Sequence, residues 1–247
     1  MTMRTLTGLV LVALVLACAP ARGANGDPDP WEPFNRAMFS FNDGVDRWVL
    51  EPVAKGYDFI LPDPVERGVS NFFQNLRVPI NGVNGLLQGK PVNGASDVGR
   101  FVVNSTVGLA GFLDPATHIG LVRHDEDFGQ TLAVWGLPNG PYVVWPLWGA
   151  STVRDTGGVC VDTAMSITPF FVDGYVTIGA RVFETVNARA LVLKDVENAR
   201  GAALDFYTFV RNAYLQRREA LVRDERAATR ETDDALYFPD ESAAPTP

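Results

Sequence analysis

Few residues in this sequence combine a reactive side chain with a spacing that could support catalysis. Asp155-Thr156-Gly157 matches the three-letter signature of the aspartic proteases. That chemistry needs two carboxylates sharing a proton, each on its own Asp-Thr/Ser-Gly loop, and this chain has one such triplet. We therefore expect Asp155 to accept local backbone hydrogen bonds in a turn rather than to act as a catalyst.

A second candidate is the run His124-Asp125-Glu126-Asp127, in which every side chain is a potential metal ligand. Consecutive side chains point apart, so few of them could reach one ion, and a Ca²⁺ loop spaces its oxygen ligands further apart. We expect a solvated, charged turn here. The only other histidine is His118, which excludes a three-histidine zinc site and a histidine-based triad.

Motifs that bind nucleotides or activate a serine are also missing from the chain. The sequence contains no Gly-x-Gly-x-x-Gly after a strand, no P-loop and no Gly-x-Ser-x-Gly. We therefore expect no cofactor, no metal and no enzymatic activity. The cysteine Cys160 lies between two valines, which favours a buried, inert thiol.

Two groups of side chains suit a membrane surface. Tyr142, Trp145 and Trp148 lie in an apolar segment interrupted by prolines, and such aromatics favour the interface between lipid and water. Ordinary core packing explains them equally well. On an amphipathic stretch nearer the C-terminus, arginines could meet lipid phosphates or simply form a solvated face; these are Arg211, Arg217, Arg218 and Arg223.

Composition narrows the class of protein. The 247 residues carry a net charge of −8, which argues against nucleic acid as a partner. Two cysteines exclude a disulfide scaffold. Hydrophobic residues make up 47% of the chain and charged residues 20%, so most of it can fold. This apolar surplus requires either a large core or a surface that faces lipid.

The N-terminus has the pattern of a bacterial secretion signal. A basic start is followed by a short apolar stretch that ends at Ala17-Cys18. This resembles a lipobox, in which cleavage after residue 17 leaves Cys18 to carry the lipid, although Leu16 stands where a smaller residue is usual. The alternative is ordinary secretion with cleavage after Ala19-Pro20-Ala21. With cleavage at the lipobox, residues 1–17 are the signal peptide and residues 18–30 are the lipidated N-terminus and tether.

Helical spacing of apolar residues predicts an all-α fold, a single domain over residues 31–223 whose helices are broken by Gly and Pro. The expected helices cover residues 34–48, 65–76, 80–87, 98–112, 178–200 and 203–223, with Pro52 and Pro79 ending the first two. Residues 129–149 are rich in Gly and Pro and fit either a short hairpin or a packed loop. Residues 224–247 are acidic and poor in apolar side chains, so we expect a disordered tail.

The sequence resembles the MlaA (VacJ) family of outer-membrane lipoproteins in a series of short motifs. They follow one another in order from about residue 29 to residue 218: residues 29–39 (DPWEPFNRAMF), 71–76 (NFFQNL), 84–89 (NGLLQG), 104–108 (NSTVG), 126–132 (EDFGQTL), 140–142 (GPY), 146–149 (PLWG) and 211–218 (RNAYLQRR). Each motif alone is weak, but together they are specific.

The resemblance implies a ring-like, mostly helical domain embedded in the inner, periplasmic leaflet of the outer membrane. Members of that family pass mislocalised phospholipids from the outer leaflet through an amphipathic channel to a periplasmic lipid carrier of the Mla pathway, and they associate with trimeric porins. The alternative is a structural envelope lipoprotein that moves no lipid. The channel-lining residues cannot be read from the sequence.

Overall fold

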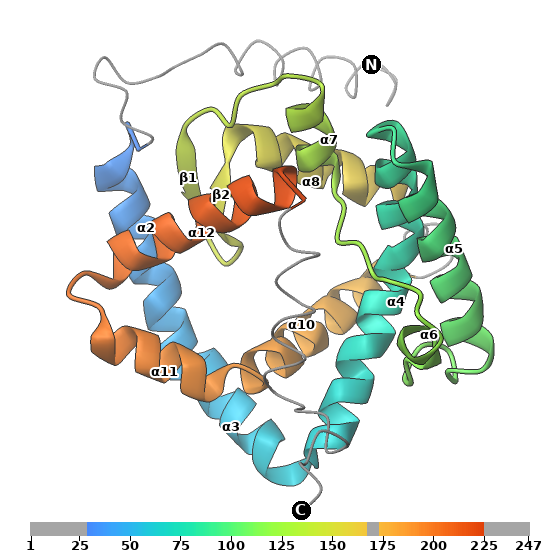
Figure 1. Cartoon of the computed structure of the whole chain (residues 1–247). Coiled ribbons are helices and arrows are strands. Elements are labelled where there is room, and N and C mark those ends of the chain that lie inside the picture. The colour runs from blue at the N-terminus through green and yellow to red at the C-terminus, as the bar shows by residue number, and fades with distance from the viewer. Residues whose placement is uncertain (1–28, 167–172, 225–247) are drawn as a thin grey trace, which may run out of the picture.

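In the computed structural model of the chain, residues 29–166 and 173–224 are described. Helices follow one another around a closed circuit, and a two-stranded hairpin lies on its inner side (Figure 1). The expected helical class is confirmed, with one small antiparallel sheet added. Within the described ranges, no helix is both long and apolar enough to cross a bilayer. The expected signal peptide, Cys18 and the acidic tail beyond residue 224 lie outside these ranges.

The first side of the circuit is one continuous helical path. It comprises α2 (Glu32–Val45), a π-helical turn η1 (Asp46–Leu50) and α3 (Glu51–Ile60). Pro52 was expected to end the first helix, but it lies in the first turn of α3. A π-helical turn lies directly before it, in which the backbone N–H of Glu51 bonds to the carbonyl oxygen of Asp46, and this turn carries the helical path past the donor that proline lacks.

The next side is α4 (Asp63–Leu87), which contains Pro79 in its interior and joins the two helices expected on either side of that proline. The helix packs closely on α5 (Pro91–Thr106) through small residues. A Cβ built on Gly94 would lie 3.2 Å from the carbonyl oxygen of Gly82. This close packing compensates for the one helical hydrogen bond that Pro79 removes.

Helix α5 ends earlier than the apolar pattern predicts. The chain turns after Thr106, and Leu109 and Ala110 adopt left-handed backbone conformations with φ of 54° and 61°. Helices α6 (Pro115–His118) and α7 (Phe128–Val134) follow, each capped by the aspartate before it. In both, the cap carboxylate accepts a hydrogen bond from a first-turn backbone N–H, which satisfies a donor that the helix leaves unpaired.

Residues 129–149 were expected to form a hairpin or a packed loop, but residues 129–134 belong to α7 and only the part from Tyr142 onward forms a hairpin. Strand β1 (Tyr142–Trp145) pairs with β2 (Gly149–Thr152), with Tyr142 opposite Thr152 and Trp145 opposite Gly149. Its turn lies at residues 146–148, whereas the Leu-Pro-Asn-Gly-Pro run at residues 137–141 leads from α7 into β1. Helix α8 (Val153–Met165) begins directly after β2.

The C-terminal part contains three helices where two were expected. They are α10 (Gly174–Ala190), α11 (Leu193–Ala202) and α12 (Phe206–Val222). Helix α12 lies beside α2 and the hairpin, where Tyr142, Val144 and Tyr207 form a buried cluster. Ion pairs close the other side of the circuit, where Arg189 of α10 contacts Asp46 of η1 at 2.8 Å.

Candidate functional site

A cavity of about 880 Å³ lies inside the circuit of helices. Its wall is built by α4, the segment before α7, the hairpin, α8, α10 and α12. Apolar side chains such as Trp148, Val159 and Leu221 alternate along the wall with charged and amide side chains. A cavity of this size is large enough for a sizeable organic ligand, and its wall is amphipathic.

One side of the wall is held by a buried ion-pair network between α12 and the α7–α8 region. Arg218 donates to Asp127 at 2.5 Å and to Asp155 at 3.0 Å. The hydroxyl of Tyr214 donates to the other oxygen of Asp155 at 2.7 Å. Burial alone would raise the pKa of Asp127, but the hydrogen bonds and charge of Arg218 outweigh it and hold that pKa below its usual range.

This network explains the Asp-Thr-Gly triplet. Thr152 caps α8 by accepting a hydrogen bond from the backbone N–H of Asp155. The carboxylate of Asp155 was expected to accept backbone hydrogen bonds, but it accepts from three side chains instead, those of Arg154, Tyr214 and Arg218. Asp155 is therefore a structural ion-pair partner in the first turn of a helix.

The run of residues 124–127 is not the solvated turn that we expected. Glu126 is 5% exposed and pairs with Lys90 at 3.0 Å. His124 contacts Asp97 at 3.3 Å, and Asp127 both caps α7 and pairs with Arg218. Asp125 pairs with Arg123 of the same segment at 2.7 Å, whereas the other three residues tie the run to α5, α7, α12 and Lys90.

The predicted membrane-interface residues divide into two groups. Tyr142 is 1% exposed and belongs to the core, which corrects the interface interpretation for this residue. The strand alternation and its packing on Tyr207 and Tyr214 turn its ring inward. Trp145 and Trp148 are 39% and 77% exposed, and both line the cavity.

The predicted arginines also differ from one another. Arg218 is buried in the network described above, so its charge is neutralised within the protein. Arg211 contacts Asp29 at 3.2 Å and lies over the ring of Tyr207. Arg217 is exposed and lines the cavity. Cys160, expected to be buried, is exposed and lines the cavity as well, because its side of α8 faces the interior of the circuit rather than α7.

Sequence reasoning missed the polar residues that α4 and α10 contribute to the wall. Arg77 and Arg181 line the cavity, and both bind Glu184. They lie about 100 residues apart in the sequence, so no local spacing indicated that they meet.

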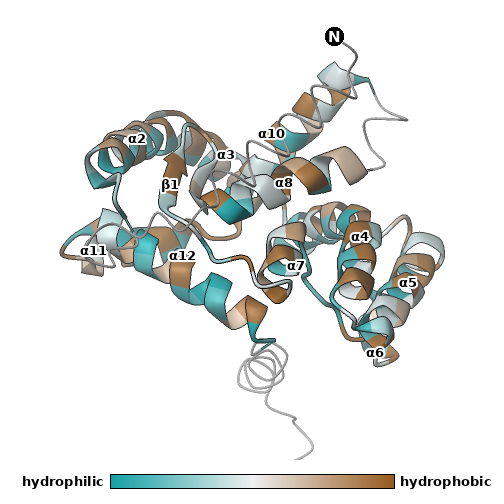
Figure 2. Cartoon of the chain, turned by 90° about the horizontal axis from the view of Figure 1, so that it is seen from above, coloured by the Kyte–Doolittle hydropathy of each residue, from teal (hydrophilic) through white to brown (hydrophobic). Residues whose placement is uncertain are grey.

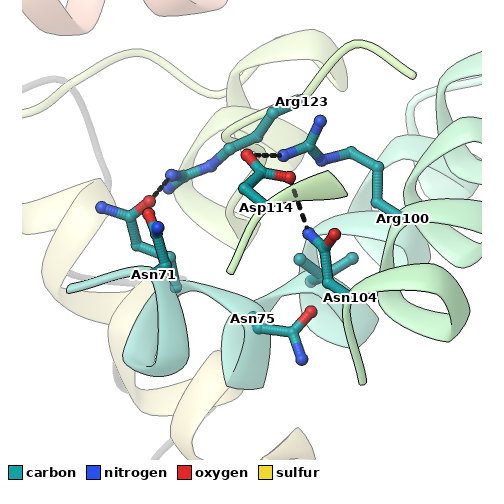
Figure 3. A pocket seen from close by; sticks show the side chains of 8 residues that line it. Asn71, Asn75, Arg100, Asn104, Asp114 and Arg123 are labelled. Atoms are coloured by element: carbon teal, nitrogen blue, oxygen red, sulfur yellow. Dashed lines mark hydrogen bonds and ion pairs between the residues drawn. The ribbon is translucent and has the colours of Figure 1, made fainter. Parts of the chain in front are cut away.

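A separate polar cluster ties α4, α5 and α6 together (Figure 3). Arg100 donates to Asp114 at 2.6 Å, and Asn104 donates to the second oxygen of the same carboxylate at 2.9 Å. Arg100 also donates to the backbone oxygen of Leu121. The hollow among these residues has a volume of about 10 Å³, which is enough for one water molecule. The cluster therefore stabilises the packing of these helices rather than binding a larger ligand.

The distribution of polarity is reversed relative to an ordinary soluble domain. Among the described residues, eighteen polar or charged side chains are buried against ten hydrophobic ones, while thirty-seven large hydrophobic side chains are exposed. Figure 2 shows hydrophobic segments on α4 and α5 and long hydrophilic segments on α12. The most exposed apolar residues include Trp48, Phe59, Val92, Tyr175 and Leu204. An apolar surface of this extent indicates contact with a membrane or a partner.

Comparisons with known proteins agree with the arrangement. Residues 27–221 match the family model described as MlaA lipoprotein. The "Intermembrane phospholipid transport system lipoprotein MlaA" of Haemophilus influenzae is 36% identical over 231 residues, covering 88% of this chain and 92% of the relative. The protein of the same name from Escherichia coli (strain K12) is 34% identical over 233 residues, covering 92% of each.

A solved structure is similar in fold as well as in sequence. It comes from work on the "Structural basis for maintenance of bacterial outer membrane lipid asymmetry". The two superpose with a TM-score of 0.71 at 36% sequence identity, covering 78% of this chain and 98% of the solved one.

Proposed function

Because this chain belongs to the MlaA lipoprotein family, a family of transport lipoproteins rather than enzymes, we propose that it transfers phospholipid between membranes and so maintains the lipid asymmetry of the outer membrane. The observation that carries the proposal is the reversed polarity of the fold. Of the exposed large hydrophobic side chains, Trp145, Trp148 and Val159 line the amphipathic cavity inside the circuit of helices, and the others lie elsewhere on the surface of the described residues.

This arrangement suits a domain seated in the inner leaflet of the outer membrane. Exposed apolar residues such as Trp48 and Phe59 would contact the acyl chains, and Trp148 would lie near the head groups. The cavity then provides a polar path for a phospholipid head group, which avoids the cost of moving a charge through hydrocarbon.

Passage through such a path is passive. A phospholipid that has reached the outer leaflet would enter the cavity, cross to the periplasmic side and leave on a periplasmic lipid carrier of the same transport pathway. A trimeric porin is the partner that would hold the domain beside the outer leaflet. Lipidation of Cys18 would anchor the chain, with the following residues as a tether.

The first test uses intact cells. The gene is deleted, and phosphatidylethanolamine at the cell surface is labelled with a membrane-impermeant amine reagent. We expect more label than in the parent strain and a return to the parental level when the gene is restored. Unchanged label, with the folded protein present in the outer membrane of the parent, would instead support a structural lipoprotein that moves no lipid.

Lipidation of Cys18 is tested separately. Metabolic labelling with a radioactive fatty acid should mark the wild-type chain and leave the Cys18→Ser variant unlabelled. A wild-type chain that carries no label would indicate ordinary secretion with cleavage further along the sequence.

A further inference from the structure

Two arginines on different helices of the cavity wall share a single carboxylate. Arg77 of α4 and Arg181 of α10 both line the cavity. Arg77 donates to Oε1 of Glu184, and Arg181 donates to Oε2 of the same side chain at 3.3 Å. Each contact uses one nitrogen of a guanidinium group that has five N–H donors.

The cluster of Arg77, Arg181 and Glu184 has an excess positive charge. One carboxylate cannot neutralise two guanidinium groups, so the three side chains together carry +1. The side chains of Arg77 and Arg181 are 53% and 61% exposed, whereas that of Glu184 is 18% exposed. The two positive groups are therefore accessible from the cavity, and the shared carboxylate is the more enclosed member.

The acidic side chains of the wall are engaged elsewhere. Asp127 and Asp155 pair with Arg218, and Glu126 pairs with Lys90. Asp162, on α8, accepts hydrogen bonds from Asn84 and from the backbone N–H of Phe128. Asp125, the remaining acidic residue of the wall, pairs with Arg123 at 2.7 Å. Each of these acidic side chains thus has a partner other than Arg77 and Arg181, whose excess positive charge lies at α4 and α10.

We propose that Arg77 and Arg181 bind the phosphodiester group of a glycerophospholipid as it passes through the cavity, with Glu184 holding the two guanidinium groups in place between passages. Guanidinium donors match the oxygens of a phosphate group, which is singly charged in a phosphodiester and complements the +1 of the cluster. Glu184 competes for the same donors, so a bound phosphate can leave again. The proposal rests on the lipid-transfer function argued above.

The test measures lipid binding to the detergent-purified full-length protein by native mass spectrometry. The probes are dioleoylphosphatidylethanolamine and dioleoylglycerol, which have the same acyl chains and differ in the phosphate-containing head group. We expect the wild-type protein to bind the phospholipid more tightly than dioleoylglycerol. In the Arg77→Gln/Arg181→Gln variant this preference should be about tenfold smaller. Binding of dioleoylglycerol should not change.

Matched variants distinguish a loss of binding caused by the missing charges from one caused by a damaged fold. Arg67→Gln removes an exposed arginine on the same helix, away from the cavity, and should keep the wild-type preference. Arg77→Lys/Arg181→Lys keeps both charges but loses the planar guanidinium donors, so its preference should lie between those of the double glutamine variant and the wild type. Glu184→Gln removes the competing carboxylate and should strengthen phospholipid binding, a gain that a damaged fold would not produce.

Several results would overturn the proposal. One is a double glutamine variant with the wild-type preference, and another is full displacement of the lipid by an excess of inorganic phosphate, which would indicate a site for a free anion. The cell-surface assay keeps the two proposals distinct. If the double glutamine variant retains the preference while the wild-type gene still clears surface phosphatidylethanolamine, this inference fails and the transport function stands.

Discussion

The Nη2 atom of Arg218 lies 3.0 Å from Oδ1 of Asp155, and this contact joins α12 to α8 across the wall of the cavity. Both side chains are at most one-tenth exposed. Burial alone would lower the pKa of Arg218, but its bonds to Asp127 and the charge of both aspartates raise it. The guanidinium group therefore stays charged and holds the C-terminal part of α12 against the first turns of α7 and α8.

Removing the carboxylate of Asp155 should destabilise the fold. The Asp155→Asn variant leaves Arg154 and Arg218 without their common partner in a buried site, which costs about 3 kcal/mol. Thermal unfolding of the detergent-solubilised protein, followed by circular dichroism, measures the loss. Asp195→Asn, at an exposed position of α11, is the control and should melt like the wild type. Equal melting points for both variants would contradict the role given to Asp155.

A methyl group at Gly158 should disrupt the contact between α7 and α8. A Cβ at this position would lie 2.4 Å from the backbone nitrogen of Gly129, and backbone cannot move aside cheaply. We expect Gly158→Ala to lose about 3 kcal/mol of stability or to fail to fold. Gly179→Ala, in α10, meets nothing within 4 Å and should gain about 0.5–1 kcal/mol. The same thermal unfolding experiment compares the two variants. The melting temperature should fall for Gly158→Ala and rise for Gly179→Ala.

The ionisation of Tyr142 should be visible at alkaline pH. Burial raises its pKa to about 12, and the nearby charge of Asp29 adds to the effect. A folded-state pKa above the unfolded value means that this contribution to stability is complete below pH ~10 and is lost as the pH rises toward 12. Tyr142→Phe should remove one late-ionising group from the ultraviolet titration of tyrosinate. It should also reduce the alkaline loss of stability.

The phenylalanine variant should otherwise be well tolerated. In the described part of the chain, the hydroxyl group of Tyr142 has no hydrogen-bond partner, so its removal strands no buried donor. Below pH ~10 the variant should be at least as stable as the wild type. Loss of one tyrosinate equivalent near pH ~10, with the late part of the titration curve unchanged, would mean that Tyr142 ionises with the exposed tyrosines.

The helical class and the family follow from the sequence because both depend on local information. The spacing of apolar residues predicted α2 and most of α12, and the series of ordered motifs indicated the family. The predicted helix ends were wrong at two prolines. Pro52 and Pro79 lie within helical stretches, because the π-helical turn before Pro52 and the packing of α4 on α5 accommodate them.

The cavity could not be predicted, because its wall combines residues that are distant in sequence. Arg77 meets Glu184 only because α10 crosses α4, and Asp127 meets Arg218 only because α12 returns to α7. The inward direction of Tyr142 depends on the hairpin packing against α2 and α12, which aromatic content alone does not reveal. The apolar surplus indicated a lipid-facing surface but did not show which face it is.

Cys160 offers a native probe of the lipid path. Its thiol is exposed on α8 and lines the cavity. A methanethiosulfonate reagent would attach a charged group there and narrow the path without changing the sequence. Treated wild-type cells should therefore accumulate surface phosphatidylethanolamine, approaching the level of the deletion strain. A sulfonate adduct should act more strongly than a trimethylammonium adduct, because its negative charge repels the phosphate of the lipid.

Two variants control for this effect. Cys160→Ser cells should show no response to the reagent. Cys160→Ser/Asp195→Cys moves the thiol to an exposed position on α11 outside the cavity, so this protein should be modified while lipid transfer continues. Mass spectrometry of the purified protein reports the extent of modification in each case. Complete modification of Cys160 with unchanged surface phosphatidylethanolamine would exclude the α8 side of the cavity from the lipid path, because a charged adduct on the wall of that path must obstruct a passing head group.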